Sequence, residues 1–156
     1  LESKTDPTGF TSDTHLVVKR VIVVANDEVP SDEHVDGETF CTNLLGGTWK
    51  QTSYNHNFRK QYAGIGMNYN ASKNKFLSAQ PYASWALDSS DDWQAPITYP
   101  SVTDDGEETP SWFYFIKWNE TKYNADNDTG WEATKSNDTS DPKTVYNWNG
   151  SAWVSE

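Results

Sequence analysis

The sequence contains few of the residues on which several protein classes depend. It has a single cysteine, Cys41, so we expect neither an internal disulfide nor a cysteine-ligated zinc site. Its most apolar segment, residues 16–25, is interrupted by Lys19 and Arg20. That segment is also much shorter than the roughly 20 apolar residues that cross a bilayer. We therefore expect a fold without disulfides and without a membrane-spanning segment.

Positive charge is also scarce. Lys and Arg number 12 against 23 Asp and Glu, which gives a formal net charge of −11. Nucleic acids and anionic lipids are bound mainly by clustered Lys and Arg, which neutralise phosphate groups. Here the cations are scattered along the chain and do not form a stripe. We expect neither a nucleic acid nor a membrane as a partner.

Templates for catalysis are missing as well. The histidines His15, His34 and His56 are far apart, and no G-x-S-x-G turn or H-E-x-x-H helix is present. Carboxylates are numerous, but they lie mostly in turn segments, where turn formation explains them. We expect a protein that is not an enzyme and that needs no cofactor. A hydrolase would require His56 within hydrogen-bond reach of a carboxylate in a cleft.

Calcium is the one metal for which the sequence offers a candidate site. Asn124, Asp126 and Asp128 are spaced like the first ligands of an EF-hand loop. The glycine of such a loop is displaced here, and Lys135 stands where the loop requires Glu. The segment is a weak candidate, and we expect no bound metal.

Aromatic residues, by contrast, are abundant. They make up 14% of the chain, with 8 Trp and 8 Tyr. Residues 16–25 add a run that is β-branched on both faces, a pattern typical of a strand inside a layered structure. Residues 49–54 and 61–69 also have strand character. We expect a mainly β fold of antiparallel sheets, built from successive aromatic-rich β-hairpins.

One short α-helix is expected near residues 36–45. Asp36 can cap its start and Gly46 can end it. Phe40 and Leu44 recur at helical spacing on one face, with Cys41 beside them as a small buried apolar residue. This segment is the only convincing helix in the sequence.

After residue 69, pairs of aromatic residues enclose short polar turns, as in β-hairpins. The pairs are Tyr69 with Phe76, Trp85 with Trp93, Trp118 with Tyr123, and Tyr123 with Trp131, and Tyr146, Trp148 and Trp153 lie around the last turn. In the last hairpin Asn149-Gly150 favours a two-residue turn. That turn would pair Trp148 with Ser151 and Tyr146 with Trp153, and it places Tyr146, Trp148 and Trp153 on one face.

The composition suggests four segments. We expect residues 1–14 to form an extended N-terminal arm or loop and residues 15–100 to form a β domain with the short helix. Residues 101–110 are acidic and end at Pro110, so we interpret them as a linker. Residues 111–156 then form a C-terminal module of aromatic hairpins.

Two groups of residues are candidates for an interface. Arg59 and Lys60 form the densest positive spot, and they pair with carboxylates either across a subunit contact or within the chain. The aromatic candidates are Trp118, Trp131, Tyr146, Trp148 and Trp153. These rings either pack hairpin against hairpin or present a flat surface on which sugars stack. Trp148 and Trp153, at the end of the chain, are expected to be the most exposed.

Several of these segments also resemble a known family. The similar stretches are Arg20-Val-Ile-Val-Val24, Phe40-Cys41 before Gly46, Gln51-Thr-Ser-Tyr54, Arg59-Lys60, Tyr62-Ala-Gly-Ile-Gly66, Pro81-Tyr-Ala-Ser-Trp85, Trp93-Gln-Ala-Pro96 and the ending Tyr146-Asn-Trp148 to Trp153-Val154. They are similar to small virion-associated proteins of marine tailed phages, mainly T4-like cyanophages and related marine phages. The likeness covers residues 16–100 and 145–154, and residues 101–144 look like an insertion.

The resemblance implies a structural role in the phage particle. It suggests a capsid decoration protein or a tail or appendage subunit, present in many copies and bound to other virion proteins. It also suggests that a short strand precedes Leu1, and it implies no catalytic residues. The alternative is a carbohydrate-binding module on a tail fibre that contacts glycans of the host surface.

Overall fold

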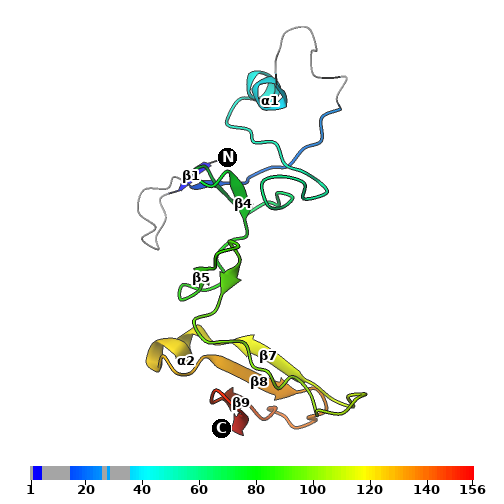
Figure 1. Cartoon of the computed structure of the whole chain (residues 1–156), viewed down its shortest axis with the longest axis vertical. Coiled ribbons are helices and arrows are strands. Elements are labelled where there is room, and N and C mark those ends of the chain that lie inside the picture. Colours follow the sequence, from blue (N-terminus) through cyan, green and yellow to red (C-terminus); the bar gives the residue numbers. More distant parts are fainter. Residues whose placement is uncertain (1, 5–14, 26–27, 29–35) are drawn as a thin grey trace. The chain divides into compact units, whose positions relative to one another are not determined.

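The computed structural model describes residues 2–4, 15–25, 28 and 36–156 (Figure 1). Across these ranges the chain is mainly β, with three antiparallel sheets and two helices, which confirms the predicted fold class. Contacts divide the chain into unit 1, Leu1–Gln80, and unit 2, Pro81–Glu156. The division differs from the boundary expected at residues 101–110, since those residues lie within unit 2.

Unit 1 contains a four-stranded antiparallel sheet in the order β1-β2-β3-β4. Its strands are β1 (Glu2–Lys4), β2 (His15–Val17), β3 (Asn68–Asn70) and β4 (Lys75–Leu77). The predicted hairpin of Tyr69 and Phe76 is confirmed, because the two residues pair directly and their ring centroids lie 5.1 Å apart. Both rings are buried with Val18 and Ala63 in the core of unit 1.

The strands of unit 1 are shorter than expected. Strand β1 falls in the predicted N-terminal arm, and residues 5–14 of that arm lie outside the described residues. The strand expected over residues 16–25 ends at Val17, and its backbone pairing continues only to Val18 among the described residues. Of the strand character expected at 49–54 and 61–69, only β3 forms.

Polar side chains explain why the segment before β3 does not form a ladder. The Ser53 hydroxyl accepts the Asn57 N–H at 3.0 Å, and His56 Nδ1 accepts the Tyr62 N–H at 3.1 Å. These side chains thus take up backbone N–H groups that would otherwise bond to a neighbouring strand. His56 and Arg59 also have φ of 57° and 56°, so the chain turns here instead of extending.

Helix α1 (Gly37–Leu45) confirms the expected helix and both of its end signals. An Asp36 carboxylate oxygen accepts the Thr39 N–H at 2.9 Å and caps the start. Gly46 ends the helix with φ of 70°. Cys41 is buried, as expected for a small apolar residue on the inner face.

Unit 2 contains a second four-stranded antiparallel sheet, in the order β10-β9-β8-β7. Its strands are β7 (Tyr114–Trp118), β8 (Trp131–Lys135), β9 (Tyr146–Trp148) and β10 (Trp153–Ser155). A separate two-stranded hairpin of β5 (Ala86–Leu87) and β6 (Trp93–Gln94) confirms the expected pairing around Trp85 and Trp93.

A second helix, α2 (Glu120–Ala125), corrects the prediction of two hairpins around Tyr123. The Asn119 side chain accepts the Lys122 N–H at 3.1 Å and caps this helix. Asn119 also donates its own N–H to the Gly130 carbonyl at 2.7 Å, which brings the two ends of the β7–β8 connection together. The chain between Trp118 and Trp131 is thus one capped helical connection.

The register predicted for the last hairpin is wrong. Trp148 lies opposite Trp153, and Tyr146 lies opposite Ser155. The Asn149 carboxamide oxygen accepts the N–H groups of Ser151 and Ala152, which stabilises a loop longer than the two-residue turn. Because the register shifts by an even number of residues, Tyr146, Trp148 and Trp153 still share one face, as predicted.

That face carries the core of unit 2. Trp118 pairs with Trp131 across β7 and β8, with ring centroids 5.1 Å apart. Trp148 and Trp153 pair across β9 and β10 at 5.2 Å. The Trp85 ring packs edge-on against both Trp118 and Trp131. The indoles therefore join the sheet to the segment that precedes it.

Candidate protein interface

The most unusual feature of unit 1 is a stretch of chain beyond β2 that has no partner strand among the described residues. At Val18 the backbone is still paired, since its N–H donates to Met67 at 2.8 Å and its carbonyl accepts from Gly66 at 2.9 Å. Over residues 21–24 the backbone makes no hydrogen bond to any part of the chain that the structure describes. We call these residues the open edge. In Figure 1 they belong to the blue trace beyond β2, with no strand alongside.

The side chains of the open edge are all β-branched and apolar. Val23 is 92% exposed and Ile22 is 36% exposed, whereas Val21 packs against the core of unit 1. Natural sheet edges are usually protected by charge, proline or a bulge, because unpaired edges pair with other chains. Residues 21–24 carry none of these protections.

A cavity of about 960 Å³ borders the open edge. Its lining includes every residue from 18 to 24 in succession. Alternate residues of an extended strand point to opposite faces, so a lining of successive residues indicates that the strand presents its backbone edge to the cavity. The first turn of α1 and residues 46–52 also line the cavity, and Trp49 and Tyr62 add aromatic surface. The cavity thus places apolar and aromatic side chains, together with charged ones such as Arg20, Glu38 and Lys50, beside backbone groups that have no partner among the described residues.

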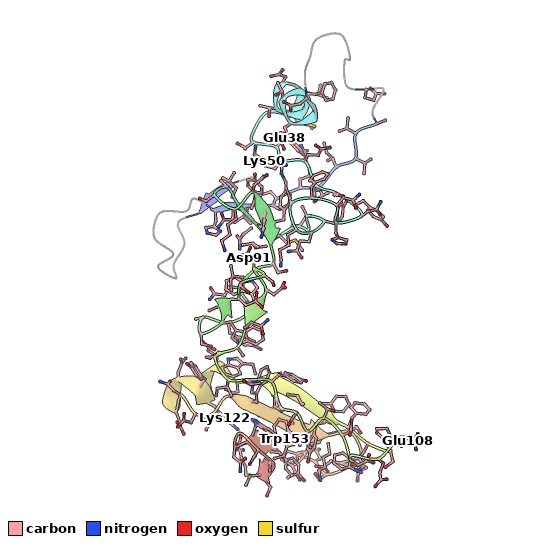
Figure 2. All side chains as sticks on the ribbon, viewed as in Figure 1. Glu38, Lys50, Asp91, Glu108, Lys122 and Trp153 are labelled. Carbon is pink, nitrogen blue, oxygen red and sulfur yellow. The ribbon has the colours of Figure 1, made fainter. Side chains whose placement is uncertain are left out.

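Glu38 fixes the position of α1 beside this cavity. Its carboxylate accepts from Lys50 Nζ at 2.8 Å, from Arg59 Nη1 at 2.6 Å and from the Gln51 N–H at 2.8 Å. Figure 2 shows Glu38 and Lys50 next to each other below α1. Burial raises the pKa of Glu38, but the hydrogen bonds from Lys50, Arg59 and Gln51 outweigh it and lower that pKa to about 2. The carboxylate therefore stays charged and keeps the helix in place.

Arg59, a candidate for the interface, has its partners within unit 1. Besides the ion pair with Glu38, its guanidinium donates to the Gln51 carbonyl at 2.7 Å and to Asn74 Oδ1 at 2.9 Å. It also lies 5.6 Å from the centroid of the Tyr69 ring. Of the two readings that the sequence leaves open, these contacts favour pairing within the chain. Lys60 follows it in a half-buried position.

The aromatic candidates belong mostly to the core of unit 2. Trp118, Trp131 and Trp148 are all buried, and the expectation that Trp148 is exposed is wrong, since 6% of it is accessible. Trp153 is half-buried, and its Nε1 donates to the Val102 carbonyl at 2.7 Å. Tyr146 is half-buried below the Lys135 ammonium, which lies 5.0 Å from its ring. These rings pack element against element, and only the Trp153 indole among the four tryptophans keeps part of its surface exposed.

Two aromatic residues that were not candidates do lie at the surface of unit 2. Phe113 and Phe115 are each about half exposed, and their ring centroids are 4.9 Å apart. Their sequence signal is the i, i+2 spacing, which places both on the sheet face opposite Tyr114. Lys143 approaches the Phe115 ring at 5.8 Å. The backbone of this patch is already paired, since the Tyr114 N–H donates to the Thr103 carbonyl.

The segment proposed for calcium has another local structure. Asn124 lies in α2, and Asp126 Oδ1 accepts the Asp128 N–H at 3.1 Å. Within the described ranges there is no group of three or more His, Cys, Asp or Glu side chains placed to hold a metal ion. None of the helices described here is long and apolar enough to cross a bilayer.

Comparison with known proteins finds no similarity. No family model, curated protein or solved structure matches the chain.

Proposed function

We propose that this chain is a non-enzymatic structural subunit of a phage particle and that it acts through protein–protein contacts made at the open edge. The observation that carries the proposal is a run of β-branched residues whose backbone has no partner among the described residues, beside a cavity that is partly lined by apolar and aromatic side chains. An exposed strand edge binds an added strand through main-chain hydrogen bonds, while flanking pockets take its side chains. Residues 21–24 supply the edge, and the cavity supplies the pocket.

The sequence adds the virion context. The segment Arg20-Val-Ile-Val-Val24 is one of the motifs that resemble small virion-associated proteins of marine tailed phages. A strand that is β-branched on both faces is typical of a strand covered on both sides. In the chain by itself Val23 is open to solvent, so its covering would come from a neighbouring subunit. A net charge of −11 would keep the unassembled protein soluble.

The alternative, a carbohydrate-binding module on a tail fibre, has less support. Sugar platforms need flat aromatic faces that are open to solvent, and three of the four Trp residues proposed for this role are buried. The fourth, Trp153, is half-buried and donates its indole N–H to Val102. Contacts between proteins therefore fit the exposed surface better than contacts with glycans do.

The test compares two lysine substitutions. Val23→Lys places a charge on the open edge, and Val154→Lys places the same charge at a half-exposed residue of β10 in unit 2. Tagged variants are produced in host cells during phage infection, and the amount in purified particles is measured by quantitative mass spectrometry. We expect at least a tenfold loss for Val23→Lys and wild-type incorporation for Val154→Lys. Equal incorporation of Val23→Lys and wild type would refute the proposed contact.

A further inference from the structure

We propose that the partner at the open edge is a second copy of this chain, and that the two edges pair antiparallel with Val23 opposite Val23 of the second copy. This inference rests on the proposed function, because it names the partner of the same surface. It also fixes the register, and therefore says which residues of the two copies meet.

The backbone decides what kind of occupant fits. Residues 21–24 present N–H and carbonyl groups that have no partner among the described residues. Backbone groups taken out of water without a hydrogen bond destabilise the structure that buries them. An apolar small molecule in the cavity would cover these groups without pairing them. An added strand pairs them and also fills apolar space, so the occupant is a strand.

Symmetry limits the possible registers between two copies. In an antiparallel pair of identical strands, the twofold axis passes through one residue that faces its own copy. With Val23 on the axis, Ile22 faces Val24 and Val21 faces Ala25 of the second copy. Every pair over residues 21–25 is then apolar. With Ile22 on the axis, Arg20 would instead face Val24, so Val23 gives the more complementary register.

Exposure leads to the same register. Val23 is 92% exposed, the highest value among the large apolar side chains of the described residues. On the axis it meets its own copy and is covered at the centre of the contact. Val21 on the same face already packs on the core of unit 1, so the new contact continues an existing apolar surface. The residue that is most exposed in the single chain thus becomes the central one.

Charge selects the antiparallel direction. Lys19 and Arg20 precede the open edge, and residues 19–25 contain no acid. Parallel pairing would set the two Arg20 side chains on strands about 4.8 Å apart. In the antiparallel register they are about 20 Å apart along the strands, more than twice the screening length of about 8 Å in physiological salt. Each cationic end also approaches a partner whose net charge is −11.

The first experiment measures association of the full chain. Sedimentation velocity is run from low micromolar to millimolar concentration on wild type, Val23→Lys and the control Val154→Lys. We expect wild type and Val154→Lys to shift from monomer to dimer as concentration rises, with Val23→Lys remaining monomeric. Because Val23 is exposed, the fold of Val23→Lys should be unchanged, and NMR spectra of the variant check this. A wild-type chain that is monomeric throughout would overturn the inference.

The second experiment tests the register. Val23→Cys places one thiol on the twofold axis, and mild oxidation should link two copies through it. Ile22→Cys faces Val24 of the second copy, so it should link at least fivefold more slowly. Wild type reports any background from the buried Cys41. Equal linking of the two variants would refute the Val23-centred pairing even if a dimer forms.

The inference and the proposed function fail in different ways. If wild type is monomeric while Val23→Lys is still lost from particles, the open edge binds another virion protein. The second-copy inference is then wrong and the proposed function stands. If Val23→Lys neither dissociates a dimer nor reduces incorporation, the open edge is not a contact surface and both are wrong.

Discussion

A single carboxylate, that of Glu38, joins α1 to the rest of unit 1. It receives two cations and one backbone N–H within hydrogen-bond distance. Glu38→Gln keeps the size of the side chain but removes its charge, and it turns a donor group toward Lys50. We expect α1 to lose roughly 1–3 kcal/mol of local stability. Amide hydrogen exchange of residues 37–45, measured by mass spectrometry, should then become about tenfold faster.

The matched control for this change is Glu28→Gln. It removes the same charge from an exposed side chain of the same unit. Exchange in α1 should be the same in this variant as in wild type. If Glu38→Gln also leaves α1 exchange unchanged, then the ion pairs do not hold the helix, and packing around Cys41 must do so.

The same carboxylate makes unit 1 sensitive to acid. Its pKa is about 2 in the folded chain, despite burial that raises it, because Lys50, Arg59 and Gln51 hydrogen-bond to the charged form. An unfolded Glu titrates near 4.3, so the stabilisation is complete above about pH 4.3 and is lost as pH falls through about 2. Urea unfolding, followed by NMR signals of α1 across this window, should show a steeper loss in wild type than in Glu38→Gln. Identical pH profiles would refute the assignment.

In unit 2 a glycine is required by close approach to an indole. A Cβ at Gly130 would lie 2.5 Å from Cη2 and 2.6 Å from Cζ3 of the buried Trp118 ring. Gly130→Ala must therefore displace that ring, and we expect a cost of about 1–3 kcal/mol. Thermal unfolding followed by near-ultraviolet circular dichroism measures it. Gly37→Ala is the control, because no heavy atom lies within 4 Å of its added Cβ. Equal melting of the two variants would contradict the tight contact.

Among the elements, α2 depends on one cap more than on its own short length. The Asn119 side chain accepts the Lys122 N–H and donates to Glu132 at 2.8 Å. Asn119→Ala removes both bonds, whereas Asn119→Ser removes the bond to Glu132 and can keep the cap. We expect the Ala variant to be about 1 kcal/mol less stable than the Ser variant. Amide exchange at Tyr123 and Asp126, whose N–H groups bond within this helix, should show the difference. Equal exchange would mean that the cap is not needed.

How far each element could be predicted depends on whether its signals are local. Helix α1 was predictable because Asp36 and Gly46 lie next to the ends that they fix. Helix α2 had the same kind of signal in Asn119, but the aromatic spacing around it also fits hairpins. The register of the last hairpin was not predictable, because a contact between two Trp rings competes with the turn preference of Asn149-Gly150.

The open edge at the candidate site could also be predicted only in part. Its β-branched composition predicts a strand over residues 16–25, but the strand ends at Val17, because a strand forms only where a neighbour supplies its hydrogen bonds. No short pattern in residues 16–25 says where that neighbour lies. Arg59 was singled out for its charge, whereas its partner Glu38 is 21 positions away in the sequence. Both the end of the strand and the ion pair of Arg59 depend on residues that are distant in the sequence.

At the scale of the whole molecule, the two units have separate apolar cores. The core of unit 1 is built around Tyr69 and Phe76, and that of unit 2 around Trp118, Trp131 and Trp148. Every residue of each cluster belongs to one unit. Most of the tryptophans that make the sequence rich in aromatic residues therefore lie in unit 2, where they build its core.

This separation predicts that residues 81–156 fold without unit 1. Their sheet, both helical caps of α2 and the tryptophan cluster are complete within that range. Amide NMR signals of the fragment should coincide with those of the same residues in the full chain. A fragment with collapsed signal dispersion would show that its core needs unit 1. If the fragment folds and remains monomeric, its rings require no partner, and the open edge of unit 1 is left as the surface for the proposed contact with neighbouring subunits.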